Sequence, residues 1–435
     1  MFHYLKGAHV PHKKNTAGMS PVIINTPKTV TIPTVMHIGA PATVSVKVGD
    51  HVDIGTLIAT ENGVVSSPVH SSVSGTVVAI EDVLLSNGKT APAVKIESDG
   101  LSTIADTVKA PKVESREELI NAIKNSGIVG LGGAGFPTYV KFGIQEPLQI
   151  SELIINGAEC EPYITSDTAT MLEDADAVSY AIEVLDRYLN FGKVIIGVEK
   201  NKLEAVNSMK RIAADNPKIS IKVLPTLYPQ GAEKVLVYHT TGKEIPQGKL
   251  PIDVGCVVCN VTTIAAIGKY LQTGMPLVEK CVTVEGVVAN PQNVIVPLGT
   301  AIGEVFEFCG GFSEEPKKVI FGGPMMGITA PDLNAPVIKN TNAIVAFGER
   351  AAKQPKSTPC IRCGACANHC PFGINPTIIA KAYKEDDIET LKACGTELCM
   401  ECGCCSFVCP AKRPIVQTNR LAKAALRAAK AKEAK

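Results

Sequence analysis

The feature that most constrains this chain is a cysteine pattern that occurs twice near its C-terminus. Ten of the 15 cysteines lie between Cys360 and Cys409, and eight of these form two copies of one spacing, C-x2-C-x2-C-x3-C-P. The first copy reads CIRCGACANHCP and the second reads CMECGCCSFVCP. Eight thiols at one repeated spacing require a small, loop-rich segment that folds around whatever the sulfurs bind.

The repeated spacing predicts iron–sulfur clusters. Four thiolates hold a [4Fe–4S] cluster, and this run is the one used by bacterial two-cluster ferredoxins, in which the fourth cysteine ligates the other cluster. We therefore expect one cluster on Cys360, Cys363, Cys366 and Cys409, and a second on Cys399, Cys402, Cys405 and Cys370. Zinc usually takes paired C-x2–4-C knuckles, and disulfides suit short secreted chains, so both fit less well. A protein with two such clusters moves single electrons.

Seven cysteines lie outside this register, and four of them bear on the metal assignment. Cys394 and Cys404 interrupt the ligand spacing, and we expect Cys404 to pack or hydrogen-bond near a cluster rather than ligate it. Cys256 and Cys259 form a lone C-x2-C without a second pair nearby, which favours buried structural thiols.

Length and composition indicate a globular chain of several domains. The 435 residues are enough for two to four domains, and 45% of them are hydrophobic. No apolar run approaches the ~20 residues of a membrane helix, and the N-terminus lacks the apolar core of a secretory signal. The net charge of +1 conceals a basic tail, because residues 411–435 contain eight Lys or Arg and one Glu. This tail fits either a solvated helix end or attraction to anionic lipid or an acidic partner.

The pattern along the chain predicts a multidomain protein of α/β and β modules. Short alternating strands predict a β domain at 1–105, and alternating helices and strands predict an α/β domain at 112–270. A second β-rich segment, which we expect to be β-grasp-like and to bind soluble ligands, covers 275–335. A ferredoxin-like α-helical domain follows at 355–412, and a basic Ala-rich helix at 413–435 ends the chain.

The first domain resembles the barrel-sandwich hybrid fold of biotinyl and lipoyl carrier domains. The segments VKVGDHVDIGTLI and SGTVV flank a hairpin at the position where carrier domains present a lysine. Here the tip carries Pro68, Val69 and His70 and no lysine. We therefore expect a packing or interaction module rather than a carrier.

A glycine-rich loop, GIVGLGGAGFPTYVKFG, opens the α/β domain. Such a loop brings backbone N–H groups against a phosphate, and a nearby lysine adds positive charge. It is not a P-loop, since the Lys-Ser/Thr pair is missing. Taken alone, the glycine run fits a tight structural turn equally well.

Three further segments, NGAECEPYITSD, YPQGAEKVL and CNVTTIAAIG, follow the glycine loop in order. Together the four resemble the flavin- and NADH-binding subunit of respiratory complex I. The resemblance implies FMN-phosphate contacts from Gly130, Gly132, Gly133 and Lys141, and flavin contacts from Asn156, Glu159, Gly231, Asn260 and Thr263. It implies NAD(H) contacts from Phe136, Glu161 and Phe142. Gly135, Tyr228 and Glu233 complete the cofactor site.

Three positions depart from that family's pattern. Leu131 stands where the family has Arg, Ala158 where it has Asp, and Ala232 where it has the first Glu of a pair. These changes remove charges that would lie near the flavin or the nicotinamide.

The order of the domains, together with the segments GGAGFPTYVK, NGAECEPYITSD and FGGPMMG (321–327), resembles the C subunits of Rnf complexes. These complexes are ion-pumping ferredoxin:NAD oxidoreductases of bacteria. The resemblance implies an NAD-linked oxidoreductase subunit of a translocase, which exchanges hydride with NAD(H) at FMN and relays electrons through two [4Fe–4S] clusters. It also implies peripheral attachment at the cytoplasmic face of the cell membrane.

The implied partners are the other subunits of the complex, a ferredoxin-linked electron donor subunit and NAD(H), and we expect no nucleic-acid partner. Two alternatives remain open at this point. One is a cobalamin reductase-type flavin and iron–sulfur protein. The other is an electron-wire or scaffold subunit with a vestigial nucleotide site, which the three departures support.

Overall fold

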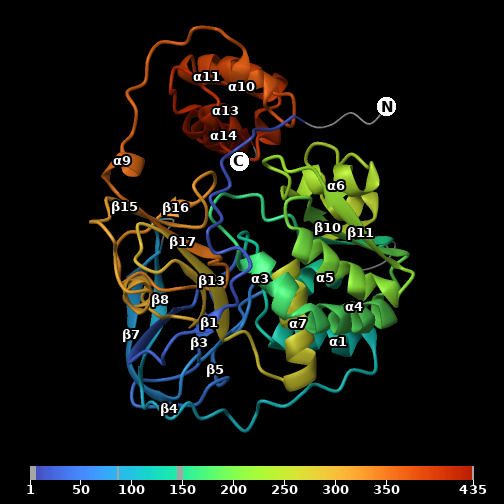
Figure 1. Ribbon diagram of the computed structural model, residues 1–435, viewed down its shortest axis with the longest axis vertical. Helices are drawn as coiled ribbons and strands as arrows, with labels where there is room; N and C mark the ends of the chain where they lie inside the picture. The colour runs from blue at the N-terminus through green and yellow to red at the C-terminus, as the bar shows by residue number, and fades with distance from the viewer. Residues whose placement is uncertain (1–5, 86–87, 145–149, 434–435) are drawn as a thin grey trace.

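The computed structural model describes residues 6–85, 88–144 and 150–433, and Figure 1 shows four modules in it. A β module and a mixed β-sheet module lie side by side, an α/β module lies beside them, and a small helical module caps one end. None of the helices within these described stretches is long and apolar enough to cross a bilayer.

The N-terminal module consists of two small antiparallel sheets. One has the order β2 (Thr29–Pro33), β8 (Thr90–Ser98), β7 (Gly75–Leu84), β4 (His51–Val52), and the other has β3 (Thr43–Val44), β5 (Leu57–Thr60), β6 (Val69–His70). Fully buried side chains, among them Ile32, Ile58 and Ile96, fill this module's core. The hairpin tip is buried from residue 66 to residue 75, so it is covered by the rest of the molecule, as expected of a packing module.

The α/β module is built on a four-stranded parallel sheet. Its order is β11 (Ile219–Leu224), β10 (Lys193–Glu199), β9 (Glu152–Gly157), β12 (Cys256–Asn260). The strands are apolar on both faces because helices cover both. Leu153 and Ile155 pack in the core with α1 (Arg116–Asn125), α4 (Ala175–Leu189), α5 (Leu203–Ala214) and α7 (Val261–Thr273). Ile154 points the other way, toward α6 (Glu233–Thr241) and the 3-10 helix η1 (Pro251–Val254).

The third module is a six-stranded mixed sheet. Its order is β1 (Val22–Ile23), β14 (Gln292–Pro297), β13 (Glu279–Gly286), β17 (Ala343–Phe347), β15 (Lys318–Phe321), β16 (Ile328–Thr329). Helix α8 (Ile302–Phe308) packs on it, and α9 (Glu349–Ala352) follows the last strand. Strand β1 comes from the N-terminal part of the chain, which ties the first and third modules together.

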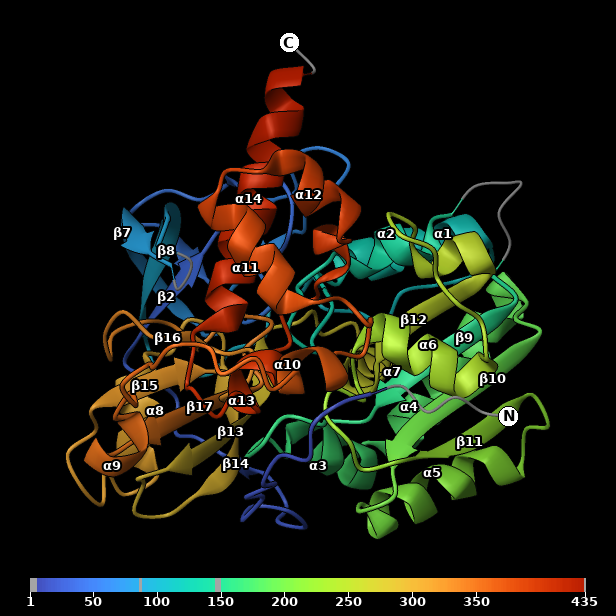
Figure 2. The same cartoon turned by 90° about the horizontal axis from the view of Figure 1, so that it is seen from above.

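The C-terminal module contains short helices and the two cysteine runs. Its helices are α10 (Ala365–Asn368), α11 (Pro376–Lys384), α12 (Ile388–Ala393), η2 (Thr396–Leu398), α13 (Cys404–Phe407) and α14 (Ile415–Glu433). Helix α11 begins with Pro376, and the Asn375 side chain caps it by accepting a hydrogen bond from the Thr377 amide. Figure 2 shows α14 leading away from the body of the molecule.

Candidate functional site

The carboxyl ends of β9 and β12 place two asparagines side by side. Asn156 and Asn260 are register partners in the parallel sheet, and ligands of such sheets bind at this edge. The Asn260 side-chain oxygen caps α7 by accepting from the amides of Thr262 and Thr263, and its Nδ2 donates to Asp167 at 2.7 Å. Asn156 donates to the Gly231 carbonyl at 2.8 Å, which brings the start of α6 to the same edge.

The glycine loop lies over this edge. Gly130 and Gly135 close it into a turn, with hydrogen bonds from the Gly130 amide to Phe136 O and from the Gly135 amide to Gly130 O. The Leu131 amide donates to Thr263 Oγ1 at 2.9 Å. In the described part of the chain, no acceptor faces the amides of Gly132, Gly133 and Ala134, which are all exposed. The loop thus presents a short run of free N–H donors beside Asn260.

Two of the glycines are needed for steric reasons. Gly133 has a φ of +122°, a conformation that side chains disfavour. A Cβ at Gly132 would lie 3.1 Å from the Asn260 side chain. Any larger residue would fill the space between the loop and the end of β12.

Residues from the two β modules hold the glycine loop from behind. Asn340 Nδ2 donates to Gly133 O at 2.7 Å, and the Ile38 amide donates to Gly135 O at 2.9 Å. Lys339 is fully buried and donates to Gly127 O at 2.7 Å and to Pro68 O at 2.6 Å at the hairpin tip. The packing module therefore acts on this loop through its buried tip.

Lys141 lies on α2 (Thr138–Phe142), directly after the loop. Its Nζ donates to Val258 O at 2.9 Å and lies 3.8 Å from a carboxylate oxygen of Glu233. The ammonium is partly exposed, so it is available to an anionic group at the sheet edge. The residues brought together around one edge of the sheet are thus Gly130, Gly132, Gly133, Gly135, Lys141, Asn156, Gly231, Glu233, Asn260 and Thr263.

Glu159 is located in a buried ionic network rather than at an open surface. Its carboxylate accepts from the Asp167 and Thr168 amides and from the Thr168 hydroxyl, and lies 3.8 Å from Lys14 Nζ. Lys202 Nζ donates to Glu159 O and to Glu199 at 3.1 Å. Burial raises the pKa of Glu159 and lowers the pKa of Lys14. This network fixes the loop that follows β9.

Glu161 and Tyr228 lie at the junction with the C-terminal module. Glu161 accepts from the amides of Met325 and Met326 at 3.1 and 2.9 Å, and burial raises its pKa to about 7. Tyr228 OH donates to the carbonyl of Cys402 at 2.8 Å and is 3.5 Å from Glu161. Both side chains are engaged by the protein itself. Phe136 is half-buried at the glycine loop, whereas Phe142 is fully buried in the core and does not face a ligand site.

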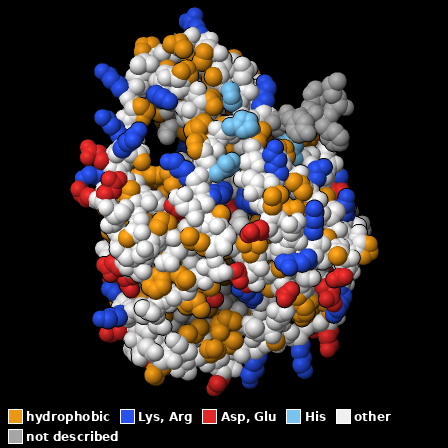
Figure 3. All heavy atoms as spheres, in the orientation of Figure 1, with side chains coloured by type: hydrophobic (Ala, Val, Ile, Leu, Met, Phe, Trp, Pro, Cys, Tyr) orange, Lys and Arg blue, Asp and Glu red, His pale blue; other side chains and the backbone are white. Residues whose placement is uncertain are grey.

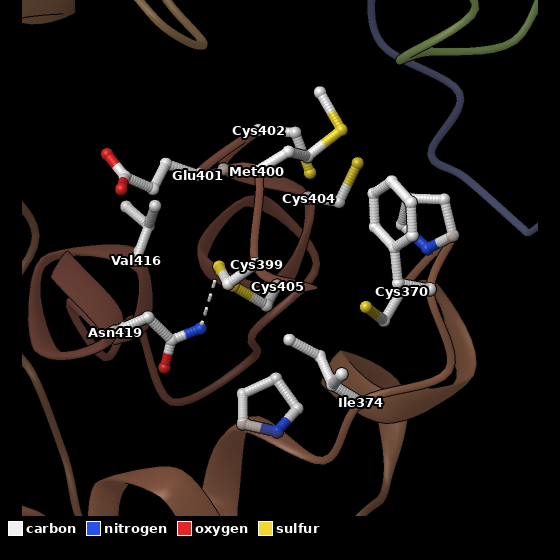
Figure 4. Close-up of a pocket in the computed structure, with 14 residues that line it drawn as sticks. Cys370, Ile374, Cys399, Met400, Glu401, Cys402, Cys404, Cys405, Val416 and Asn419 are labelled. Carbon is white, nitrogen blue, oxygen red and sulfur yellow. Dashed lines mark hydrogen bonds between the residues drawn. The ribbon is translucent and has the colours of Figure 1, made fainter. Parts of the chain in front are cut away.

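Cysteines of both runs line a pocket in the C-terminal module. Cys370 of the first run joins Cys399, Cys402 and Cys405 of the second around it, and Figure 4 shows these sulfurs arranged about the space. Asn419 on α14 donates to Cys399 Sγ at 3.5 Å (Figure 4). The neighbouring side chains are mostly apolar, among them Ile374 and Val416.

The other four cysteines of the pattern divide into a buried pair and an exposed pair. Cys366 and Cys409 pack in one buried cluster, whereas Cys360 and Cys363 are exposed. Among the described residues, no three Cys, His, Asp or Glu side chains converge closely enough for a single metal ion. A cubane binds each thiolate at a different iron, so its ligand sulfurs lie farther apart than those around one ion.

The cysteines outside the pattern have structural surroundings. Cys404 Sγ donates to Tyr228 O at 3.7 Å, and Cys394 Sγ donates to Leu391 O at 3.6 Å. Cys256 and Cys259 pack in different cores, on opposite faces of β12, so the two thiols do not converge. Burial raises the pKa of Cys256 to about 12 and the pKa of Cys259 to about 11.

Several residues at the site carry no recognisable signal in the sequence. Lys14, Lys339 and Asn340 are ordinary polar residues outside the four segments, and only the fold brings them to the loops they hold. Asp167 ends the segment NGAECEPYITSD, and the resemblance assigns it no role. Met325 and Met326 lie in the FGGPMMG segment, to which the family resemblance assigns no role.

Comparison with known proteins defines the class first. The model of the Nuo51 FMN-binding domain matches residues 123–269, the RnfC barrel-sandwich hybrid domain matches 2–101, and the SLBB domain matches 281–329. The chain therefore combines a complex I-type FMN-binding domain with a barrel-sandwich hybrid and an SLBB domain.

Three relatives define the family, and each is the C subunit of an ion-translocating complex. The chain is 41% identical over 381 residues to that of the Na(+)-translocating ferredoxin:NAD(+) oxidoreductase complex of Acetobacterium woodii, covering 86% of each protein. It is 40% identical over 378 residues to that of the proton-translocating complex of Clostridium ljungdahlii, covering 86% of this chain and 82% of the relative. It is 37% identical over 421 residues to that of the ion-translocating oxidoreductase complex of Rhodobacter capsulatus, covering 95% of this chain and 81% of the relative.

The chain belongs to this family, the C subunits of ion-translocating ferredoxin:NAD(+) oxidoreductase complexes, as its motifs predict. Among solved structures, an NAD+-reducing [NiFe]-hydrogenase in the air-oxidized state aligns with a TM-score of 0.48 at 19% identity, covering 64% of this chain and 54% of the other.

Proposed function

We propose that this chain is the peripheral electron-transfer subunit of an ion-translocating ferredoxin:NAD oxidoreductase, located at the cytoplasmic face of the cell membrane. It exchanges hydride with NAD(H) at FMN and relays single electrons through two [4Fe–4S] clusters. The observation that carries the proposal is the direct contact between the α/β module and the C-terminal module. Tyr228 connects the module bearing the glycine loop directly to the backbone of Cys402, and Glu161 beside it binds the 325–326 segment.

The sheet edge fits an FMN phosphate and ring. The free amides of Gly132 and Gly133 and the partly exposed ammonium of Lys141 supply donors and positive charge for a phosphate. Glycine at 132 lets the loop pack against Asn260, and a Cβ at Gly133 would meet nothing within 4 Å, so the Gly133 side of the loop is open to a ligand. Bound FMN would supply the conversion between a two-electron hydride and single electrons.

The cysteine geometry fits two interleaved clusters. Cys370, Cys399, Cys402 and Cys405 share a pocket, so they would hold one cluster. Cys366 and Cys409 pack together, and with Cys360 and Cys363 they would hold the other. Apolar surroundings and the hydrogen bond from Asn419 to Cys399 are the features that tune a cluster's potential.

Contacts within the protein indicate which of the two proposed clusters lies nearer the flavin site. The Tyr228 hydroxyl and the buried Cys404 thiol fix the second cysteine loop against the α/β module. Glu161 fixes the 325–326 segment beside it. The cluster in the pocket of Cys370 and the second run is therefore the one nearer the flavin, and the exposed cysteines of the first run lie on the outer side. The family membership favours this function over a cobalamin reductase.

Replacing Lys141 by Met tests the flavin assignment. We expect the dissociation constant for FMN to rise by about tenfold, because one charged phosphate contact contributes about 1.4 kcal/mol. Iron and sulfide content should stay unchanged. The measurement is fluorescence of FMN released on dilution of anaerobically reconstituted protein, and the matched control is Lys210→Met on α5. Equal FMN retention in the two variants would contradict the assignment.

A further inference from the structure

The two cysteine loops are internal copies, and their surroundings differ. In the register of the repeat, Gly364 corresponds to Gly403, Arg362 to Glu401 and Ile361 to Met400. Gly364 and Gly403 share nearly the same backbone conformation, with φ of +73° and +80°. The surroundings of the two cysteine loops can therefore be compared position by position.

The second loop is docked against the rest of the chain. A Cβ at Gly403 would lie 2.9 Å from the carbonyl oxygen of Met325, so the two backbones touch. Tyr228 OH donates to Cys402 O, and Cys404 is 1% exposed. The second loop is thus held both by the α/β module, through Tyr228, and by the mixed-sheet module, through Met325.

The first loop is bare. A Cβ at Gly364 would meet nothing closer than Asn368 at 3.8 Å, and every residue from 353 to 364 is exposed. Ile361 is 66% exposed, and Phe407, two residues before Cys409, is 43% exposed. The Thr358 amide donates to Ala411 O, which places 358–364 and 409–413 on one surface. This surface therefore includes exposed apolar side chains close in sequence to cysteines of the pattern.

The charge around this bare loop has one sign. Every charged residue between Glu349 and Glu385, and between Glu401 and Glu433, is Lys or Arg. Figure 3 shows Lys, Arg and apolar side chains on the visible face of this module, at the top of the view, and no acidic ones. Glu401 is paired with Arg420 and Lys423, whereas its counterpart Arg362 has no acidic partner among the described residues.

We propose that the bare loop 358–364, with Phe407, Lys412 and Arg413 around it, is the docking surface for an acidic electron-carrying protein. This rests on the proposed function. The partner takes toward the first loop the place that Tyr228 and Met325 take toward the second, with its apolar contact on Ile361 and its carboxylates opposite Arg362 and Lys412. Electrons then cross between proteins at the outer cluster and within this chain at the inner one.

The opposite charges fit a fast, short-lived encounter. Electron-transfer partners form small interfaces, and charge complementarity increases their association rate by about 10- to 1000-fold at low salt. The basic residues attract the acidic partner during its approach, and the exposed apolar side chains exclude water once it is bound. A mostly basic surface with few apolar side chains is typical of a transient electron-transfer interface rather than of a permanent one.

The test uses the reconstituted full chain and a small acidic two-[4Fe–4S] ferredoxin as the probe. Binding is measured by interferometry at about 20 mM and about 500 mM salt, where screening removes most surface attraction. We expect Arg362→Glu and Lys412→Glu each to weaken low-salt binding by about tenfold and to differ little from wild type at high salt. The matched control is Lys210→Glu on α5, which changes the net charge equally at a distant helix.

A second readout follows bleaching of the clusters by the reduced ferredoxin, which needs neither FMN nor NAD+. Cluster bleaching should slow in parallel with binding in the two variants, while bleaching by dithionite-reduced methyl viologen, a small radical cation, should not. If cluster bleaching depends on Arg362 but no NADH forms, the docking surface stands and the flavin assignment fails.

Three results would overturn the proposal. One is equal binding by Arg362→Glu, Lys412→Glu and Lys210→Glu. Another is loss of binding to phosphatidylglycerol vesicles in the two loop variants with unchanged ferredoxin binding, which would make the surface a membrane contact. The third is a concentration-dependent dimer that only the loop variants abolish.

Discussion

At the scale of single residues, the interleaving of the cysteines is the most specific consequence of the sequence. Cys370 lies in the same pocket as Cys399, Cys402 and Cys405, although its own run is some thirty residues away. The crossing follows from the two loops facing one another. In the proposed arrangement, a residue of one run is therefore a ligand of the cluster nucleated by the other.

Replacing Cys370 by Ser tests this directly. We expect the variant to lose about half of its iron, because one of two four-iron clusters loses a ligand. Thiols bound to iron resist alkylation, so Cys399, Cys402 and Cys405 should become reactive to iodoacetamide while Cys360, Cys363 and Cys366 stay protected. Mass spectrometry of the peptides measures both, and Cys394→Ser is the control that keeps all its iron. Reactive Cys360 and Cys363 with protected Cys399 would show that each run holds its own cluster.

At the scale of elements, the glycine loop depends on modules outside its own. Its carbonyl at Gly127 binds Lys339, and its carbonyl at Gly133 binds Asn340. Lys339 is fully buried without a carboxylate partner among its hydrogen-bond acceptors in the described chain, and burial lowers its pKa to about 7. The hairpin tip that would carry a lysine in a carrier domain instead receives one from another module.

This lysine predicts a pH dependence. Between about pH 7 and 10.5 the unfolded chain holds a proton that the folded chain lacks at Lys339, so the free energy of unfolding rises with pH by up to about 1.4 kcal/mol per unit. We expect the melting temperature of the wild type, relative to Lys339→Met, to increase from pH 7 to pH 9. Lys317→Met, at an exposed ion pair, should show no such trend. Parallel pH profiles of wild type and Lys339→Met would contradict the account.

The sequence predicts some of these elements and not others, for physical reasons. Helix α11 begins at Pro376 as its capping residues indicate, and the fold class follows from strand and helix periodicity. The asparagines at the ends of β9 and β12 are also predictable, since parallel strands align their carboxyl ends. The contacts of Lys339 and Lys14 are not predictable, because they join segments more than a hundred residues apart through backbone carbonyls, which leave no mark in a sequence.

The contacts of Glu161 and Tyr228 are likewise not predictable from the sequence. The resemblance assigns them to the cofactor site, and their side chains lie at the joint between modules, where they bind Met325, Met326 and Cys402. A motif match identifies residues that a family shares. The packing of two modules then decides which of their side chains remain free to bind a ligand.

At the scale of the whole molecule, the C-terminal module is fastened mainly at one loop. The segment from α9 to α10 is exposed and extends along the outside of the molecule in Figure 1. The hydrogen bond from Tyr228 to Cys402 and the contact of Gly403 with Met325 hold the module in place. Its position relative to the α/β module sets the distance that electrons must cross.

Replacing Tyr228 by Phe should loosen this joint. Loss of the hydrogen bond costs about 1 kcal/mol, which raises the undocked population by roughly fivefold. We expect faster limited proteolysis within 353–364, with unchanged FMN and iron content. Tyr139→Phe, which removes a hydrogen bond of similar length to Val64 at a different module boundary, is the control. Equal cleavage rates in the two variants would show that Tyr228 does not hold the joint.

The most direct test of the central claim is an anaerobic titration of the fully loaded protein with NADH. The absorption of the flavin and of the clusters is followed in the same sample, with FMN and iron content measured beforehand. The account predicts that NADH bleaches the flavin and that cluster absorption then decreases as electrons pass on. Unchanged flavin absorption in protein that contains FMN and both clusters would contradict it.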